Sequence, residues 1–192
     1  MKKLVVFASG SGSNFQAIID AVRQKKLNVE IAGLITNRDG IGAIERAIKN
    51  RIPVNVINET DEQLFKRKLA DQLKKWQPDL IVLAGFLKKI PAEIVNDFPN
   101  KIINIHPALL PKFGGKGFYG LRVHEAVINS GEKTSGCTVH YVNNEYDRGQ
   151  ILEQKEVPVY STDSPESLAK RVLKAEHELL PSVIKKLFTQ TN

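Results

Sequence analysis

The sequence predicts an α/β fold in one domain spanning residues 1–192: a doubly wound, mostly parallel sheet with an antiparallel C-terminal extension and helices on both faces. Three observations support this prediction. Short apolar runs alternate with segments of helical periodicity through the first half of the chain. Residues 79–84 form a continuous apolar run, which is typical of a central parallel strand covered on both faces. Two strand-like runs separated by a polar turn come later, and this spacing suits an antiparallel extension.

The individual elements follow from the period of the apolar residues. Strands are expected where a short run is apolar and rich in β-branched residues, and helices where apolar residues recur every three to four positions. The predicted strands are residues 4–8, 29–36, 54–57, 79–84, 101–105, 135–142 and 150–157. The predicted helices are residues 13–26, 41–50, 61–76, 121–129 and 165–188. Repeated strand–helix units of this kind imply right-handed crossovers.

The last predicted helix carries clear start signals. Ser164 suits the N-cap position, Pro165 suits the first helical position, and Glu166 adds a carboxylate to the first turn. Apolar residues recur on one face as far as Leu187. Pro181 lies inside this pattern, and a kink is expected there.

The charge of the chain favours anionic partners. Lys and Arg number 28 against 21 Asp and Glu, which gives a net charge of +7. A nucleic acid and a small anionic substrate both fit this balance. The basic residues occur as scattered pairs without interleaved aromatic residues, so we expect solvated helix faces and no nucleic-acid partner. Cys137 is the single cysteine, which excludes an internal disulfide, and it is expected to be a small buried residue.

The first residues predict a strand and not a leader peptide. Two lysines precede an apolar stretch of only five residues, 4–8, which is shorter than the roughly 7 to 15 residues of a secretory signal. No apolar run approaches the roughly 18 to 20 residues that span a bilayer. We therefore expect a cytoplasmic protein without a membrane partner.

The segment from Asn104 to Pro111 is the first candidate for chemistry. A β-branched run ends there, and Pro107 biases His106 toward an extended backbone, so the strand should stop at the histidine. Asn104 and His106 are two positions apart and leave the strand on the same face. An amide beside an imidazole suits stabilisation of an oxyanion and movement of a proton. Each also has a structural explanation, a loop cap for Asn104 and a satisfied buried histidine for His106.

A glycine-rich turn, residues 9–14, joins the first strand to the first helix. Glycines there let backbone N–H groups approach an anion at the helix N-terminus. A dinucleotide fingerprint needs a third Gly or Ala where Phe15 stands, and the acidic residue for a ribose hydroxyl is missing, although Arg38 suits a 2′-phosphate. A monophosphate fits better, with an NADP-dependent oxidoreductase as the rival class. A plain turn capped by Ser13 or Asn14 is the structural alternative.

Several other polar residues have ordinary explanations. Asp147 lies in a polar turn, where aspartate is common for local reasons. His124, His140 and His177 are expected to be structural, and no pair has the spacing of a zinc site on a helix. Residues 114–117 form either a mobile substrate loop or a plain surface loop. Only the fold can bring Asp147 near the candidate strand.

Together these segments resemble one family, the folate-dependent phosphoribosylglycinamide formyltransferases. The resemblance runs through nearly the whole chain. Its motifs are Gly10-Ser11-Gly12-Ser13-Asn14, Leu83-Ala84-Gly85-Phe86, Asn104-Ile105-His106-Pro107, Leu109-Leu110-Pro111, Gly115-Lys116-Gly117, Gly136-Cys137-Thr138-Val139-His140, Asp147 and Ala175-Glu176-His177. Other enzymes that use 10-formyltetrahydrofolate share the Asn-x-His strand with a distant Asp. Chain length then favours this family, because methionyl-tRNA formyltransferase and formyltetrahydrofolate deformylase each carry a further domain.

The resemblance implies transfer of the formyl group of 10-formyltetrahydrofolate, a co-substrate, to the amine of glycinamide ribonucleotide in purine biosynthesis, without a metal. It implies that Asn104 and a protonated His106 stabilise the oxyanion, while Asp147 raises the pKa of His106. The residues implied for the ribonucleotide are Gly12, Ser13, Asn14 and Glu176. Those implied for the folate are Leu87, Lys88, Lys89, Ile90, Asn104, Asn143, Asn144, Glu145, Tyr146 and Asp147. Both substrates are small molecules, and a monomer or a homodimer is expected.

Two positions depart from the family's pattern. Some relatives carry a basic residue before the third helix for the folate tail, where this chain reads Glu59-Thr60-Asp61-Glu62. Lys66 or Arg67 are the available substitutes. Ala108 stands where several relatives have Ser, which removes a hydroxyl but no catalytic group.

Overall fold

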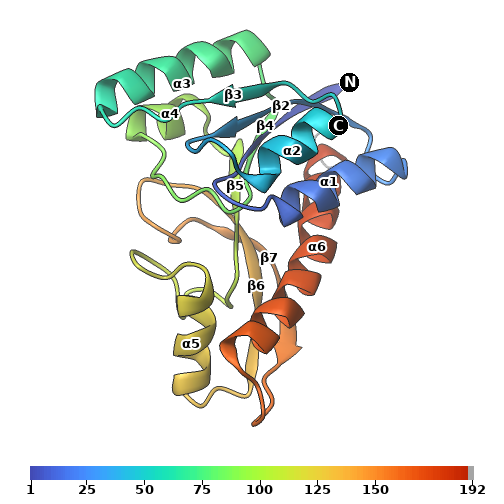
Figure 1. Cartoon of the computed structure of the whole chain (residues 1–192), viewed down its shortest axis with the longest axis vertical. Coiled ribbons are helices and arrows are strands. Elements are labelled where there is room, and N and C mark those ends of the chain that lie inside the picture. Colours follow the sequence, from blue (N-terminus) through green and yellow to red (C-terminus); the bar gives the residue numbers. More distant parts are fainter. Residues whose placement is uncertain (190–192) are drawn as a thin grey trace.

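The computed structural model describes residues 1–189, in which strands and helices alternate along most of the chain (Figure 1). The strands are β1 Lys2–Phe7, β2 Val29–Thr36, β3 Val54–Val56, β4 Leu80–Leu83, β5 Ile102–His106, β6 Thr134–Tyr141 and β7 Ile151–Pro158. The helices are α1 Ser13–Arg23, α2 Gly42–Lys49, α3 Glu62–Trp76, α4 Ala92–Asp97, α5 Leu121–Asn129 and α6 Pro165–Thr189.

All seven strands belong to one mixed sheet with the order β3-β2-β1-β4-β5-β6-β7. The strands from β1 to β5 pair in parallel, whereas β6 is antiparallel to both β5 and β7. The predicted doubly wound sheet with an antiparallel C-terminal extension is therefore confirmed. The chain leaves β1 through β2 and β3 and returns on the other side of β1 with β4. The order thus reverses between β1 and β4, where ligands bind in sheets of this kind.

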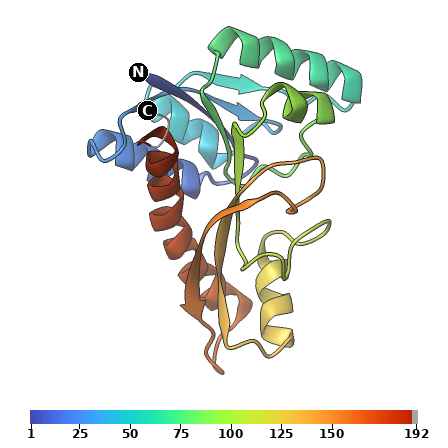
Figure 2. The same ribbon diagram turned by 180° about the vertical axis from the view of Figure 1, so that it is seen from behind.

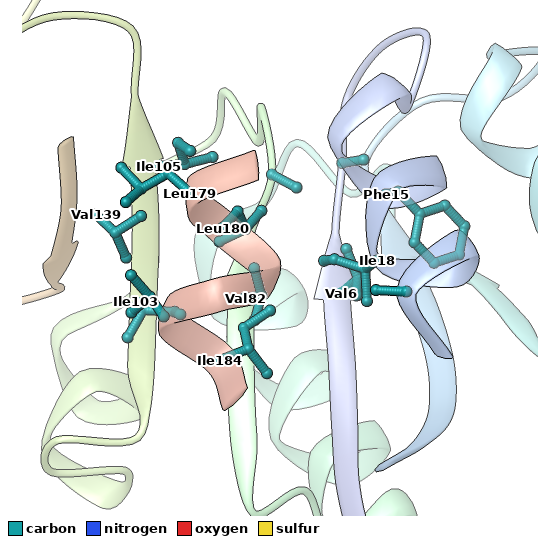
Figure 3. Close-up of a cluster of buried hydrophobic side chains, with 14 of the residues drawn as sticks. Val6, Phe15, Ile18, Val82, Ile103, Ile105, Val139, Leu179, Leu180 and Ile184 are labelled. Atoms are coloured by element: carbon teal, nitrogen blue, oxygen red, sulfur yellow. The ribbon is translucent and has the colours of Figure 1, made fainter. Parts of the chain in front are cut away.

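Side chains of the central strands alternate between two apolar layers. In β1, Val6 points into one layer and Phe7 into the other, as the period of two requires. The first layer packs under α1, α2 and α6, and Figure 3 shows Ile18 of α1 and Leu180 of α6 within it. The second layer packs under α3 and α4. Helices therefore cover both faces of the sheet (Figures 1 and 2).

Two details differ from the sequence-based expectation. Helix α1 ends at Arg23, three residues early, because Lys25 adopts a positive φ of 57° in the turn that follows. Helix α4 has only six residues after Pro91, too few for a helical period to be visible in the sequence. Helix α6 includes Pro181, and the kink expected there stays a prediction. Among residues 1–189, no helix has both the length and the apolar character needed to cross a membrane.

The loops after β1 and β4 are joined directly beyond the carboxyl ends of the strands. Ser9 N donates to Gly85 O at 3.0 Å, and Leu87 N donates to Ser9 Oγ at 3.0 Å. The Ser9 hydroxyl in turn donates to Asn37 Oδ1 at 2.6 Å. These bonds fix the edge of the sheet on which the candidate site lies.

Candidate active site

A cavity of about 610 Å³ lies at the carboxyl ends of β4 and β5. Its walls come from the loops after β4 and β6, the end of β5, the loop 115–120, and helices α5 and α6. It therefore adjoins the position that the strand order indicates for a ligand, between β1 and β4. Among the residues in its wall are Asn14, Asn104, His106, His140, Asp147 and Glu176.

Strand β5 presents Asn104 and His106 to this cavity. The strand ends at His106, as predicted, and both side chains lie on the same face because they are two positions apart. His106 is 4% exposed. Its Nε2 lies 2.8 Å from the carbonyl oxygen of Phe113, so Nε2 carries the proton of the neutral ring and donates it to that carbonyl.

Asp147 reaches both of these side chains from the turn after β6. Its Oδ2 lies 3.6 Å from His106 Nδ1, and its Oδ1 accepts a hydrogen bond from Asn104 Nδ2 at 3.4 Å. The backbone N–H of Gly115 donates to Oδ2 at 2.9 Å and holds the carboxylate in place. The fold thus brings the three residues together, and their catalytic roles stay predictions.

His140 is a fourth member of this group, although only a structural role was expected for it. It stands directly opposite Asn104 in the antiparallel register of β5 and β6, so both side chains lie on one face. Its Nδ1 lies 2.8 Å from Tyr141 O and is the donor there. Nε2 is then free to accept from Asn104 Nδ2 at 3.1 Å, which orients the amide. His140 Nε2 also lies 3.5 Å from Asp147 Oδ1. The signal that could have identified His140 is the pairing of the two strands, which places it opposite Asn104.

Burial and neighbouring charges shift the pKa values of His106 and Asp147 in opposite directions. Burial lowers the pKa of His106 below its ordinary value, and the Asp147 carboxylate offsets only part of this decrease. The expected increase from Asp147 is therefore present but outweighed, and the uncomplexed site favours a neutral His106. Burial alone would raise the pKa of Asp147, but the imidazoles of His140 and His106 beside the carboxylate and the N–H of Gly115 lower it overall.

The residues implied for the ribonucleotide divide into two groups. Asn14 and Glu176 line the cavity, and Asn14 Nδ2 donates to Glu176 Oε2 at 2.7 Å. Burial raises the pKa of Glu176 to about 7, and the Asn14 hydrogen bond reduces this increase. Gly12 and Ser13 do not line it, although they adjoin Asn14 at the N-terminus of α1. Ser13 lines a second cavity, between α1 and α6.

Gly12 is required by the shape of the turn. Its φ of 73° is left-handed, and a Cβ there would lie 2.8 Å from Ala43 Cα. The N-terminus of α2 packs this closely because Ala43 N donates to Gly10 O at 3.2 Å. Arg46 of α2 supports the same turn, since its Nε donates to Ser11 O at 2.9 Å.

The residues implied for the folate are mostly in the cavity wall, with two exceptions. Those that line it are Leu87, Lys89, Ile90, Asn104, Asn143, Glu145, Tyr146 and Asp147. Lys88 turns away, because its Nζ donates to Glu59 O at 2.6 Å and lies 3.8 Å from the centre of the Phe65 ring. Asn144 lies outside, with its Nδ2 3.5 Å from Asn96 Oδ1.

The structure shows the hydrogen-bond and ion-pair partners at the two positions that depart from the family's pattern. Lys66, one of the substitutes for the basic contact, is paired with Glu93 at 2.7 Å. Ala108 is fully buried, and its carbonyl accepts from Thr138 Oγ1 at 2.7 Å. The smaller side chain at position 108 therefore leaves the backbone hydrogen bond at this position in place.

Comparisons with known proteins identify the family of the chain. The formyl transferase family model matches residues 2–184. The chloroplastic phosphoribosylglycinamide formyltransferase of Arabidopsis thaliana is 49% identical over 187 residues, which cover 95% of this chain and 64% of the relative. The chain thus spans less than two thirds of that relative, and 61% of a similar protein from Vigna unguiculata.

Solved structures match over nearly their full length. The phosphoribosylglycinamide formyltransferase of Bacillus halodurans is 34% identical with a TM-score of 0.91, covering 100% of this chain and 97% of that one. Glycinamide ribonucleotide transformylase 1 of Geobacillus kaustophilus is 38% identical with a TM-score of 0.90, and the match covers 97% and 98% of the two chains. The chain therefore belongs to the formyl transferase family, in its phosphoribosylglycinamide formyltransferase branch.

Proposed function

We propose that this protein transfers the formyl group of 10-formyltetrahydrofolate to the amine of glycinamide ribonucleotide, giving formylglycinamide ribonucleotide and tetrahydrofolate. The observation that carries the proposal is one cavity that holds Asn104, His106 and Asp147 together with the Asn14–Glu176 pair. The first group suits an acyl transfer and the second a polar amine substrate. Family membership supports the same reaction.

The chemistry begins with attack of the glycinamide amine on the formyl carbon. A tetrahedral species forms, and negative charge develops on the formyl oxygen. Asn104 Nδ2 and a protonated His106 stabilise this oxygen. One N–H of Asn104 leaves its long contact with Asp147 Oδ1, and Nε2–H of His106 leaves the Phe113 carbonyl, to reach it. The second proton of the charged ring is on Nδ1, which faces Asp147 Oδ2 at 3.6 Å. This arrangement explains why a buried histidine needs an adjacent carboxylate.

Collapse of the tetrahedral species breaks the bond between the formyl carbon and N10 of the folate. N10 takes up one proton, and the new amide nitrogen has lost one, so the overall reaction releases no net proton. Asp147 is placed to carry this proton, through His106 or through water. The negative charge that develops on the formyl oxygen, together with the Asp147 carboxylate, favours the charged form of His106 while the oxyanion exists.

The two substrates occupy opposite ends of the cavity in this proposal. The ribonucleotide phosphate binds backbone N–H groups at Gly12 to Asn14, where the helix N-terminus favours an anion. Its glycinamide end meets Glu176. The folate lies against the loop after β4, including Leu87 and Ile90, and the turn 143–147 after β6. Main-chain groups of these loops suit the edge of a heterocycle.

The proposal is tested by incubating the purified, chelator-treated protein with both substrates. We expect formylated ribonucleotide and tetrahydrofolate in equal amounts, without added metal. Folded protein that yields no formylated product contradicts the proposed function. Omitting the ribonucleotide controls for hydrolysis of the formyl folate, which is the reaction that a deformylase would show.

Nucleic acid is not expected to bind, and the assembly state is proposed to be a monomer or a homodimer. The cytoplasmic location also stays a prediction, because the relative from Arabidopsis thaliana is described as chloroplastic. Fractionation of the source cells and sedimentation of the purified protein test these two points.

A further inference from the structure

His124 lies in the wall of the same cavity and has no role in the reaction described above. It belongs to α5 and is 4% exposed. Helix α5 packs against α6, which supplies Leu173 and Glu176 to the cavity. Figures 1 and 2 both show α5 beside α6 and well separated from α4. Helix α5 therefore lies beside α6, which carries Glu176 of the proposed ribonucleotide site.

The hydrogen bonding of the His124 ring is incomplete. Nδ1 is buried and has no hydrogen-bond partner among the described residues. Because Nδ1 is enclosed while the residue lines the cavity, the ring reaches the cavity through Nε2. Burial, and then the positive charge of nearby His106, lower the pKa of His124 to about 4. The ring is therefore neutral near neutral pH and carries a single proton.

The position of that proton follows from the surroundings of the two nitrogens. A proton on Nδ1 would be a buried donor without an acceptor, which costs more than a buried lone pair. We therefore assign the proton to Nε2, so that the ring presents one N–H donor to the cavity. A histidine kept only for packing gains nothing from this arrangement, since an apolar side chain would fill the same space with no unpaired polar atom.

We propose that His124 Nε2 donates a hydrogen bond to a neutral oxygen of the ribonucleotide, either a ribose hydroxyl or the glycinamide carbonyl. This bond holds the substrate so that its amine faces Asn104 and His106. The proposal rests on the proposed function. A neutral oxygen is the fitting acceptor because the phosphate is already assigned to the N-terminus of α1, and His124 is on a different element.

The test combines activity with direct binding. Calorimetry measures the Kd of the ribonucleotide for the wild type, His124→Leu and His124→Gln, and steady-state kinetics measure KM for both substrates. We expect His124→Leu to raise the Kd and the KM of the ribonucleotide about tenfold, as the loss of one hydrogen bond predicts, with the KM of the folate unchanged. His124→Gln retains a side-chain donor and should recover part of the affinity. Glu125→Gln, an exposed neighbour on the same helix, is the control.

The source of the acceptor oxygen is separated with a 2-deoxyribose analogue of the substrate. A matching 3-deoxyribose analogue covers the second hydroxyl. If a hydroxyl is the acceptor, the penalty of His124→Leu disappears with one of the two analogues, and if the carbonyl is the acceptor the penalty persists with both. A Kd within about twofold of the wild type in a folded His124→Leu protein overturns the proposal. A shift in the pH profile of kcat with unchanged Kd also overturns it, since that result places the effect on His106.

Two further measurements keep the outcomes distinct. If His124→Leu does not fold, His124→Gln and the analogues decide the question, because a change of Kd in a variant with the wild-type melting temperature is not structural. Product formation by the wild type tests the proposed function separately. A wild type that binds the ribonucleotide but forms no product contradicts the reaction and leaves the calorimetric test of His124 in place.

Discussion

Asn14 and Glu176 are 162 positions apart in the chain, yet Asn14 Nδ2 donates a 2.7 Å hydrogen bond to Glu176 Oε2. The bond joins the N-terminal turn of α1 to the middle of α6 at one end of the cavity. Asn14 Oδ1 is also buried and has no partner among the described residues, so the pair keeps an acceptor for a ligand. A carboxyl group enclosed in this way should control both stability and substrate binding.

The first prediction concerns the pH dependence of stability through Glu176. Burial raises its pKa from 4.5 to about 7, so between these values the folded protein holds a proton that the unfolded chain releases. The contribution of Glu176 to the free energy of unfolding should therefore fall by about 1 kcal/mol for each pH unit in this range. Urea denaturation of Glu176→Gln should show a weaker decrease with pH than the wild type.

The Glu153→Gln change is the control for removal of a carboxylate, because Glu153 is only half-buried and pairs with Lys186 outside the cavity. If the free energy of unfolding depends on pH identically in Glu176→Gln and in the wild type, Glu176 has the same pKa in the folded protein as in the unfolded chain, and the prediction is wrong.

The second prediction concerns Asp147. Replacing it by Asn keeps the shape but removes the negative charge 3.6 Å from His106 Nδ1, so the pKa of His106 should fall further. Turnover should decrease about 10²- to 10³-fold, as for loss of one oxyanion contact. Since the reaction uses charged His106, the pH above which activity is lost should move down. Unchanged pH–rate profiles of kcat in Asp147→Asn would refute this coupling.

The third prediction assigns His140 a positioning role through Asn104. His140→Phe removes the acceptor for Asn104 Nδ2, so kcat should fall about tenfold, roughly the effect of one neutral hydrogen bond. KM for both substrates should change little, because Asn104 acts on the oxyanion. His140→Gln offers a side-chain oxygen and should restore part of kcat. A merely structural role would lower the melting temperature without this rescue.

The fourth prediction compares two glycines of the turn after β1. Gly12→Ala forces a side chain to within 2.8 Å of Ala43 at a φ of 73°, and should destabilise the protein by about 1–3 kcal/mol. Gly10→Ala meets no atom within 4 Å and should have a small effect on stability. Urea denaturation measures the free energy of unfolding of both variants. Equal losses in Gly12→Ala and Gly10→Ala would mean that α2 can move away from this turn at little cost.

The fifth prediction concerns Arg46, which holds the same turn from α2. Its Nε donates to Ser11 O at 2.9 Å and its Nη1 donates to Gln16 Oε1 at 3.0 Å. Arg46→Ala should raise KM for the ribonucleotide about three- to tenfold and leave KM for the folate unchanged, because Arg46 holds Ser11 beside the proposed phosphate contacts while the bonds of Ser9 to the loop after β4 remain. Lys49→Ala, on the exposed side of the same helix, is the matched control. Equal increases for both substrates would point to a general loss of structure.

The sequence by itself determined the features that depend on local periodicity. The period of two placed Asn104 and His106 on one face, and Pro107 ended β5 at the histidine. Alternating apolar runs gave the mostly parallel sheet, since each buried strand and amphipathic helix has its own pattern. Helix α4 was not predicted, because its six residues do not complete two helical turns.

Only the tertiary structure decided which distant residues meet. Asp147 reaches His106 because the turn after β6 folds over the end of β5, and His140 faces Asn104 because of the register between those antiparallel strands. The same structure turned Lys88 toward α3 and enclosed Glu176 beside Asn14. Such contacts depend on strand order, register and burial, which arise from the packing of the whole chain and leave no periodic signal in the sequence.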